Sequence, residues 1–171
     1  DVIVLARELN MLQVKEISDI IARDQIKGPA GELVQIEMFC HGALCMAISG
    51  KCYLSLHEYG SSANRGSCFQ ICRRGYEVTD LETGAQLHVD NKYIMSPKDL
   101  CTIEFIDKMI NAGVSVLKIE GRARSAEYVK TVTASYRKGV DAVLNGTFTP
   151  EYAAGLKKDL ETVFNRGFWD G

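Results

Sequence analysis

The sequence predicts an α/β fold in which parallel strands alternate with helices. Short apolar runs alternate with longer segments whose apolar residues recur at helical spacing, and Gly-containing turns separate the two kinds of segment. Only four clear strands are present, which is half the number in an eight-stranded α/β barrel. The 171 residues, 46% of them hydrophobic, suit one domain with a sizeable core. We therefore expect part of a barrel, with each strand followed by a crossover helix.

The first predicted elements are a strand, a helix and a second strand. An apolar run at residues 2–5 predicts the first strand, and Asn10 with Gln13 three residues later forms a capping box at a helix start. Glycines around Pro29 end the helical segment. Residues 34–39 predict the second strand. The chain opens on this first strand without an initiator Met, so we expect a fragment whose preceding half is missing.

A different character marks residues 40–91, which hold five of the six cysteines and no long periodic pattern. Residues 76–78 and 86–89 predict a small hairpin around the turn at 82–84. A connection this long in a compact domain predicts a functional or cross-linked segment. We therefore expect a cysteine-rich insert over residues 40–91.

Regular patterning returns in residues 92–171, where we expect two further strands and three helices. Ser96-Pro97-Lys98-Asp99 is typical of a helix start, because it combines a capping Ser, Pro at the first position and an acid at the third. Ser125 opens a long helix in the same way. The remaining predicted elements are strands at residues 93–95 and 114–119 and a last helix at residues 150–164.

Polar side chains follow the predicted strands. In parallel α/β folds the chemistry collects at the carboxyl ends of the strands, so these residues should share one face. They are Arg7 and Glu8 after the first strand, His41 and the insert after the second, Ser96 after the third, and Glu120, Gly121 and Arg122 after the fourth. A charged triplet after an apolar strand suits a phosphate or carboxylate site. The alternative is that Glu120 and Arg122 only pair or cap the long helix.

Four cysteines of the insert form two pairs with different spacing. Six residues separate Cys45 from Cys52, and three separate Cys68 from Cys72. Structural zinc sites usually have two to four residues between paired ligands, which only the second pair satisfies. An iron–sulfur cluster is larger and tolerates wider spacing. Spacing alone favours a cluster over zinc and leaves a metal-free insert open. Three arginines would offset the thiolate charge: Arg65, Arg73 and Arg74.

Composition excludes several other classes. Disulfides are typical of small secreted chains with weak cores, whereas these cysteines cluster beside strong core segments. We expect the remaining two, Cys40 and Cys101, to be small buried hydrophobes. The net charge of −2 gives no sign of a nucleic-acid or membrane partner, although a local basic patch is compatible with it. No apolar run approaches the roughly 18 residues needed to span a bilayer, and no secretory signal is visible, so we expect a cytoplasmic protein that does not enter the membrane.

Residues 37–55, EMFCHGALCMAISGKCYLS, resemble the signature of peptidase family U32, the collagenase-like proteases. Residues 6–8, 118–122 and 164–168 also resemble the family. The resemblance implies a catalytic region over residues 1–171 that is the second half of a TIM-type (β/α)8 barrel. It further implies a 4Fe-4S cluster on Cys45, Cys52, Cys68 and Cys72, with zinc as the alternative metal.

Family members of this kind take part in oxygen-independent hydroxylation, with targets that include the tRNA wobble uridine, a ribosomal RNA cytidine and the ubiquinone ring. We expect an RNA substrate here, such as the tRNA wobble uridine. The resemblance also implies an anionic small molecule such as prephenate as the hydroxyl source. We expect the catalytic residues to be Glu8, Glu37, His41, Glu120 and Arg122. We expect the substrate-binding residues to be Arg7, Arg65, Arg73 and Arg74. An isolated half barrel would expose sheet edges and self-associate.

Peptidase chemistry is the main alternative, because the family is named for it. A peptidase needs an activated nucleophile or a metal-bound water. The sequence has no His-Glu-x-x-His helix and no Gly-x-Ser-x-Gly turn. Cys40 beside His41 is an unpromising thiol–imidazole pair, because adjacent strand residues point to opposite faces. Three hypotheses therefore stand: RNA hydroxylation with an iron–sulfur cluster, a metal-dependent peptidase, and a zinc-stapled binding domain.

Overall fold

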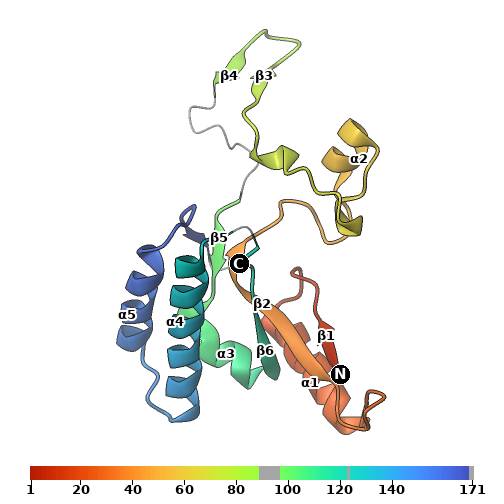
Figure 1. Cartoon of the computed structure of the whole chain (residues 1–171). Helices are drawn as coiled ribbons and strands as arrows, with labels where there is room; N and C mark the ends of the chain where they lie inside the picture. The colour runs from red at the N-terminus through yellow and green to blue at the C-terminus, as the bar shows by residue number, and fades with distance from the viewer. Residues whose placement is uncertain (89–96, 123, 170–171) are drawn as a thin grey trace. The chain divides into compact units, whose positions relative to one another are not determined.

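The structure, a computed structural model, describes residues 1–88, 97–122 and 124–169. It divides into two compact units, the first joining Asp1–Ala43 to Lys98–Gly171 and the second comprising Leu44–Pro97 (Figure 1). The strand predicted at residues 93–95 and the predicted capping residue Ser96 lie outside the described residues.

The first unit is built on a mixed sheet. Its strands β1 (Val2–Val4) and β6 (Val114–Ile119) both pair in parallel with the long strand β2 (Gln35–Ala43), as the sequence predicts. Two short strands extend the sheet: β5 (Asp99–Cys101) pairs antiparallel with the end of β2, and β7 (Phe168–Trp169) pairs in parallel with β5. The parallel strands β1, β2 and β6 bring their carboxyl ends to the same edge of the sheet.

The prediction of a helix that starts at residues 96–99 is wrong. Asp99–Cys101 forms β5, and a 3₁₀ turn at Ile103–Phe105 leads into helix α3 (Ile106–Asn111). Residues 99–101 form a strand and not a helix because the last residues of β2 offer an edge for pairing, on which Cys101 pairs with His41. The Asp99 side chain, expected in the first turn of a helix, is instead buried and paired with Arg124 and Arg166.

Three longer helices begin as their capping residues predict. Helix α1 (Met11–Arg23) starts with a complete capping box, in which Asn10 and Gln13 exchange side-chain to backbone hydrogen bonds of 3.0 Å each. Helix α4 (Ala126–Leu144) is capped by the Ser125 hydroxyl, and helix α5 (Pro150–Glu161) begins on a proline after its capping Thr149.

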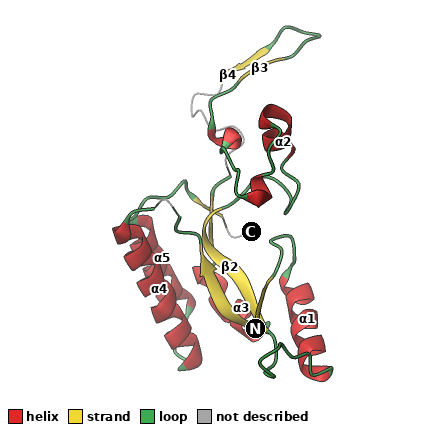
Figure 2. Cartoon of the chain, turned by 45° about the vertical axis from the view of Figure 1, so that its right-hand side comes forward, coloured by secondary structure: helices red, strands yellow, loops and turns green. Residues whose placement is uncertain are grey.

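The helices pack in a row against the sheet, α1 next to α3, α3 next to α4 and α4 next to α5 (Figure 2). Val14 of α1, Ile36 and Cys40 of β2, and Val132 of α4 belong to one buried cluster between helices and sheet. Of the apolar residues at helical spacing in α4, Val132 and Tyr136 are buried, whereas Val129 is 43% exposed. The rest of the buried face is formed by Tyr128, Ser135, Gly139 and Ala142.

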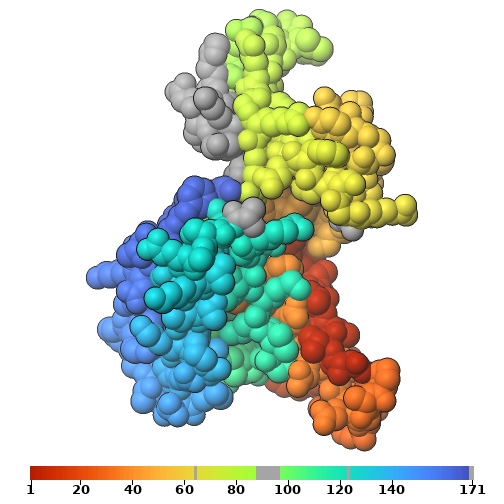
Figure 3. Space-filling model, in the orientation of Figure 1, coloured from red at the N-terminus to blue at the C-terminus, as the bar shows by residue number. Residues whose placement is uncertain are grey.

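The second unit carries short elements joined by turns. Helix α2 (Tyr53–Tyr59) and two 3₁₀ turns, Ala63–Arg65 and Ile71–Arg73, come first. The predicted hairpin follows as β3 (Glu77–Thr79) paired antiparallel with β4 (Gln86–His88), and its prediction is confirmed. In the space-filling view, the yellow and lime surfaces belong to this unit and the cyan and blue ones to α4 and α5 (Figure 3).

The chain is therefore a mixed α/β protein with helices against a largely parallel sheet. Strand β1 remains substantially exposed, with Val2 at 45% and Val4 at 51%. The half barrel stays a prediction. None of the helices in the described residues has both the length and the apolar composition that crossing a bilayer requires.

Candidate functional site

The ends of β2 and β6 meet at His41 and Glu120. His41 pairs with Ile119, and its carbonyl accepts a 2.8 Å hydrogen bond from the Glu120 N–H. Gly42 makes this approach possible, because it has φ +107° and a Cβ there would lie 2.5 Å from the Glu120 carbonyl oxygen. Two of the predicted catalytic residues are thus brought together at the expected edge of the sheet.

His41 lies in an aromatic box and is only 1% exposed. Its ring centroid is 5.9 Å from that of Tyr128 and 5.5 Å from those of Tyr136 and Phe168. The two tyrosines lie about two turns apart on α4, and Phe168 comes from β7. Three elements therefore hold the imidazole in place.

Hydrogen bonds around Tyr136 fix the tautomer of His41. The Tyr136 hydroxyl donates its single proton to the Cys40 carbonyl at 2.7 Å and accepts the Thr102 N–H at 3.0 Å. His41 Nδ1 lies 3.4 Å from the Tyr136 hydroxyl oxygen. Because the hydroxyl proton already points to Cys40, Nδ1–H is the donor to Tyr136. This assignment leaves Nε2 as the atom with a lone pair, and within the described residues no hydrogen bond reaches it.

Burial keeps this imidazole neutral. It lowers the pKa of His41 to about 4, outweighing the opposite effect of the Asp99 carboxylate, while the Arg124 cation lowers the pKa further. A neutral imidazole with a free Nε2 can accept a proton or bind a metal ion, whereas a protonated one can do neither. His41 is therefore a buried, neutral imidazole at the edge that the sequence predicts.

An arginine–carboxylate–arginine group lies beside His41, and sequence reasoning missed it. Asp99, 1% exposed, accepts hydrogen bonds from Arg124 at 3.1 Å and Arg166 at 2.9 Å. Both guanidinium groups also lie over the Phe164 ring, at 4.6 and 5.3 Å from its centroid. Asp99 stood inside a predicted helix start, Arg124 just before a predicted helix and Arg166 in the family-like segment 164–168, so no sequence signal connected the three.

The predicted catalytic pair Glu120 and Arg122 has a local structural role. The Glu120 carboxylate accepts the Arg122 backbone N–H at 2.9 Å, and the Glu120 carbonyl accepts the Tyr128 hydroxyl at 3.3 Å. These bonds shape the loop between β6 and α4, close to the capping alternative. The Arg122 side chain is exposed at this edge. After β1, Arg7 and Glu8 form an ion pair of 3.8 Å with each other.

Glu37 lies four residues before His41 on β2, and its carboxylate is paired with a cation. Its carboxylate pairs with Lys118 of β6, whose ammonium group also lies 5.4 Å from the centre of the Phe39 ring. Since strand residues alternate, Glu37 and Phe39 share the face of β2 opposite to the buried Ile36. The pairing places Glu37 apart from the aromatic box around His41.

All four predicted metal-binding cysteines belong to the second unit. Cys52 directly precedes α2, and Cys72 lies within the second 3₁₀ turn, both partly buried. Cys45 and Cys68 occupy the connecting loops and are exposed. None of the four forms a disulfide.

Hydrogen bonds tie together the segments that carry these cysteines. The Ser55 hydroxyl, three residues after Cys52, donates to the carbonyl of Ser67 at 3.2 Å, next to Cys68. Arg73, next to Cys72, reaches the carbonyl of Leu44 at 3.5 Å, next to Cys45. The two bonds link the four cysteine-bearing segments in two pairs.

The surroundings of Cys72 show how close its neighbours are. Burial raises the pKa of Cys72, Arg73 lowers it, and the Cys45 and Cys68 thiols raise it. At least three of the thiols therefore lie within electrostatic range of one another. Among residues 1–88, 97–122 and 124–169, no three Cys, His, Asp or Glu side chains converge on a single metal ion.

This donor set fits an iron–sulfur cluster. Four thiols with a neighbouring arginine match the ligands and charge balance that such a cluster needs, and its bulk separates its ligands more widely than one ion does.

Cys40 and Cys101 are buried, as predicted, and burial raises both thiol pKa values. Cys40 donates to the Lys118 carbonyl at 3.4 Å, so it is a core residue and not a reactive nucleophile.

Comparison with known proteins decides the family. The model of peptidase family U32 matches residues 1–171, the whole chain. The chain belongs to peptidase family U32. The resemblance seen in the sequence is thereby confirmed. No significant match to a solved structure is found.

Relatives within U32 carry two kinds of name. A "Collagenase" of Porphyromonas gingivalis is 63% identical over 171 residues, covering 100% of the chain and 41% of the relative. The "tRNA hydroxylation protein P1" of Bacillus subtilis is 43% identical, covering 98% of the chain and 40% of the relative. The "23S rRNA 5-hydroxycytidine C2501 synthase" of Escherichia coli is 43% identical, covering 83% and 20%. The chain thus spans about two fifths, or less, of these relatives.

Proposed function

We propose that this U32 chain is part of an enzyme that hydroxylates RNA, with tRNA as the favoured substrate and an iron–sulfur cluster as cofactor. Four cysteines outside disulfides, on segments that hydrogen bonds join in two pairs, carry the proposal. Relatives named for tRNA hydroxylation and for rRNA hydroxycytidine synthesis support the RNA substrate. An enzyme of tRNA would work in the cytoplasm.

Cys45, Cys52, Cys68 and Cys72 are the residues that would hold a 4Fe-4S cluster, with zinc as the alternative metal. When bound, such a cluster supplies electron-transfer chemistry that protein side chains lack. Arg73 contributes a cation beside Cys72, which favours the thiolate form of a ligand. The cluster identity is part of the proposal.

The first unit would bind the anionic hydroxyl source, for which prephenate is the proposed molecule. The exposed Arg122 guanidinium at the end of β6 suits a carboxylate. His41, neutral and with an unprotonated Nε2, would accept a proton at that atom. The Asp99–Arg124–Arg166 group would position the aromatic box around His41, because Arg124 also lies 5.1 Å from the centre of the Tyr128 ring.

Mass spectrometry of tRNA tests the hydroxylation. A strain that lacks the protein should lose 5-hydroxyuridine, and the wild-type gene should restore it. Complementation with Cys45→Ser or Cys72→Ser should fail, whereas Cys101→Ala, which changes a buried thiol outside the set, should succeed. Unchanged 5-hydroxyuridine in the deletion strain would refute the proposal for tRNA.

A metal-dependent peptidase is the second candidate, favoured by the relative named "Collagenase" at 63% identity. The buried, hydrogen-bonded Cys40 argues against a thiol nucleophile paired with His41. Gelatin cleavage by purified protein that survives Cys45→Ser and Cys52→Ser would support the peptidase. A colourless protein holding one zinc ion would instead favour the zinc-stapled binding domain.

A further inference from the structure

A solvent-facing aromatic pair lies among the cysteine-bearing segments of the second unit. Tyr59, at the end of α2, and Phe69, next to Cys68, have ring centroids 4.7 Å apart at an interplanar angle of 36°. They remain 42% and 50% exposed. Two large aromatic side chains that contact each other yet stay in water gain little from burial, so folding alone does not explain them.

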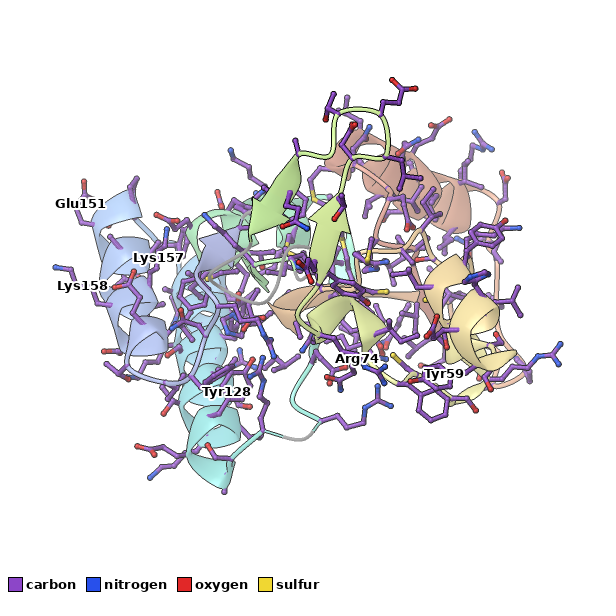
Figure 4. All side chains as sticks on the ribbon, turned by 90° about the horizontal axis from the view of Figure 1, so that it is seen from above. Tyr59, Arg74, Tyr128, Glu151, Lys157 and Lys158 are labelled. Atoms are coloured by element: carbon purple, nitrogen blue, oxygen red, sulfur yellow. The ribbon has the colours of Figure 1, made fainter. Side chains whose placement is uncertain are left out.

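A guanidinium group completes the surface. The Arg74 side chain lies over Tyr59, with its central carbon 5.4 Å from the ring centroid, as Figure 4 shows for the two labelled residues. Arg74 is itself exposed. Tyr59, Phe69 and Arg74 thus form an exposed cluster of two tilted rings and a planar cation, which we term the stacking platform.

The backbone is strained where it presents Phe69. Gln70 has φ 52°, a left-handed conformation that costs a non-glycine residue about 1 kcal/mol or more. The turn leaves Phe69 in solvent while Ile71 is buried at 7% exposure. A chain that needed Phe69 only for packing would bury it, and the strain is retained with the ring facing out.

The chain segment that carries the platform is basic, which favours an anionic partner. Residues 44–76 carry four basic residues and one acidic residue, Glu58, a net charge of +3 in a chain whose total is −2. The basic residues are Lys51, Arg65, Arg73 and Arg74. Exposed aromatic rings beside arginines are how proteins bind single-stranded RNA, because bases stack on the rings while cations meet the phosphates. A protein partner would not require this local positive charge.

We propose that Tyr59, Phe69 and Arg74 bind an unpaired nucleotide of a single-stranded RNA by stacking, beside the cysteine site. The inference rests on the proposed function in taking RNA as the substrate and adds the residues that hold it. Because the contact is stacking, it depends on the aromatic face and not on the Tyr59 hydroxyl. Loops of folded RNA would bind, and continuous duplex would not, since duplex bases are not available to stack.

Binding of a fluorescently labelled single-stranded RNA of about 12 nucleotides, within the length that such a module spans, tests the platform in the full-length protein. Tyr59→Leu and Phe69→Leu keep apolar bulk and remove the ring, so each should raise the Kd about tenfold, the low-to-middle range for one stacked base. Tyr59→Phe keeps the ring and should stay within about twofold. Tyr152→Leu on α5, where the tyrosine is also 42% exposed, is the matched control and should leave the Kd unchanged.

Several results would overturn the platform. These are unchanged binding by both leucine variants, an equal loss in Tyr59→Phe or Tyr152→Leu, tighter binding of duplex than of single strand, and no RNA binding by the wild type. Ultraviolet cross-linking of 4-thiouridine RNA to wild-type protein checks the same point without a variant. Cross-links should map to residues 59–74, and cross-links confined to other peptides would refute the assignment.

The platform and the proposed hydroxylation fail separately. If Tyr59→Leu/Phe69→Leu cells keep normal 5-hydroxyuridine, the platform is wrong while the activity stands. If the wild type binds RNA through the platform but cells that lack the whole protein keep their 5-hydroxyuridine, the proposed hydroxylation is wrong while the binding surface stands.

Discussion

Asp99→Asn is the substitution whose cost the structure defines best. The carboxylate is 1% exposed and bonds to Arg124 and Arg166, whose side chains are 10% and 25% exposed. The amide is nearly the same size, so the change removes the charge and creates no cavity. Two cations that face each other across a neutral group then remain, and burial limits how far water can compensate them.

Removing one partner of a buried ion pair typically costs about 3–5 kcal/mol. Because Arg166 keeps some exposure, we expect the low end, about 3 kcal/mol. With a urea m-value of about 1–3 kcal/mol/M, the unfolding midpoint should fall by about 1–3 M. The loss should concentrate where β5 pairs with β2 and β7, since Asp99 is the first residue of β5.

Urea unfolding followed by circular dichroism measures this cost. Asp141→Asn is the matched control, because Asp141 pairs with Arg137 on the exposed face of α4, with side chains 55% and 58% exposed. Such surface pairs contribute about 0.5 kcal/mol or less. If Asp99→Asn costs no more than Asp141→Asn, the buried arginine–carboxylate–arginine group is not a stabilising centre, and the account of the site around it is wrong.

Two further predictions concern the edge of the sheet. The folded pKa of His41, about 4, lies below its unfolded value of about 6.5, so the unfolded state binds more protons between these values and stability should fall as pH drops through that window. His41→Gln should flatten this dependence and His57→Gln, at an exposed position, should not, as urea midpoints from pH 7.5 to 4.5 would reveal. Gly42→Ala should cost more free energy of unfolding than Gly84→Ala, because both have positive φ but only Gly42 faces the Glu120 carbonyl; equal costs would contradict the close approach.

Local patterns in the sequence predicted the parts of the fold that local physics decides. The Asn10 capping box, the Ser125 cap and the hairpin from Glu77 to His88 are each specified by a few neighbouring residues, and each is confirmed. The parallel strands β1, β2 and β6 follow from apolar runs separated by helices. The family followed from a long signature in residues 37–55 and is confirmed over the whole chain.

Long-range pairings could not be predicted in this way. Asp99 matched the pattern of a helix start, but it is buried in contact with Arg124 and Arg166. These arginines lie 25 and 67 residues further along the chain. His41 was expected at the edge, whereas its burial depends on Phe168 of β7. Local rules carry no information about such partners.

The candidate site residues differ in whether the structure brings them together. His41 and Glu120 are adjacent, as predicted, while Glu37 is paired with Lys118 on the sheet face. Ser135 and Gly139 are part of the buried face of α4, but a pattern of large apolar residues does not identify small residues as buried. The ligand roles of the four cysteines stay a prediction.

Metal analysis of the full-length protein, purified without oxygen, tests the central claim most directly. The account predicts broad brown absorbance at roughly 400 nm and about four irons per chain, as a cluster on four thiolates requires. Cys45→Ser and Cys72→Ser should lose the iron, and Cys101→Ala should retain it. A colourless protein with one zinc ion, or iron that persists in both serine variants, would contradict the account.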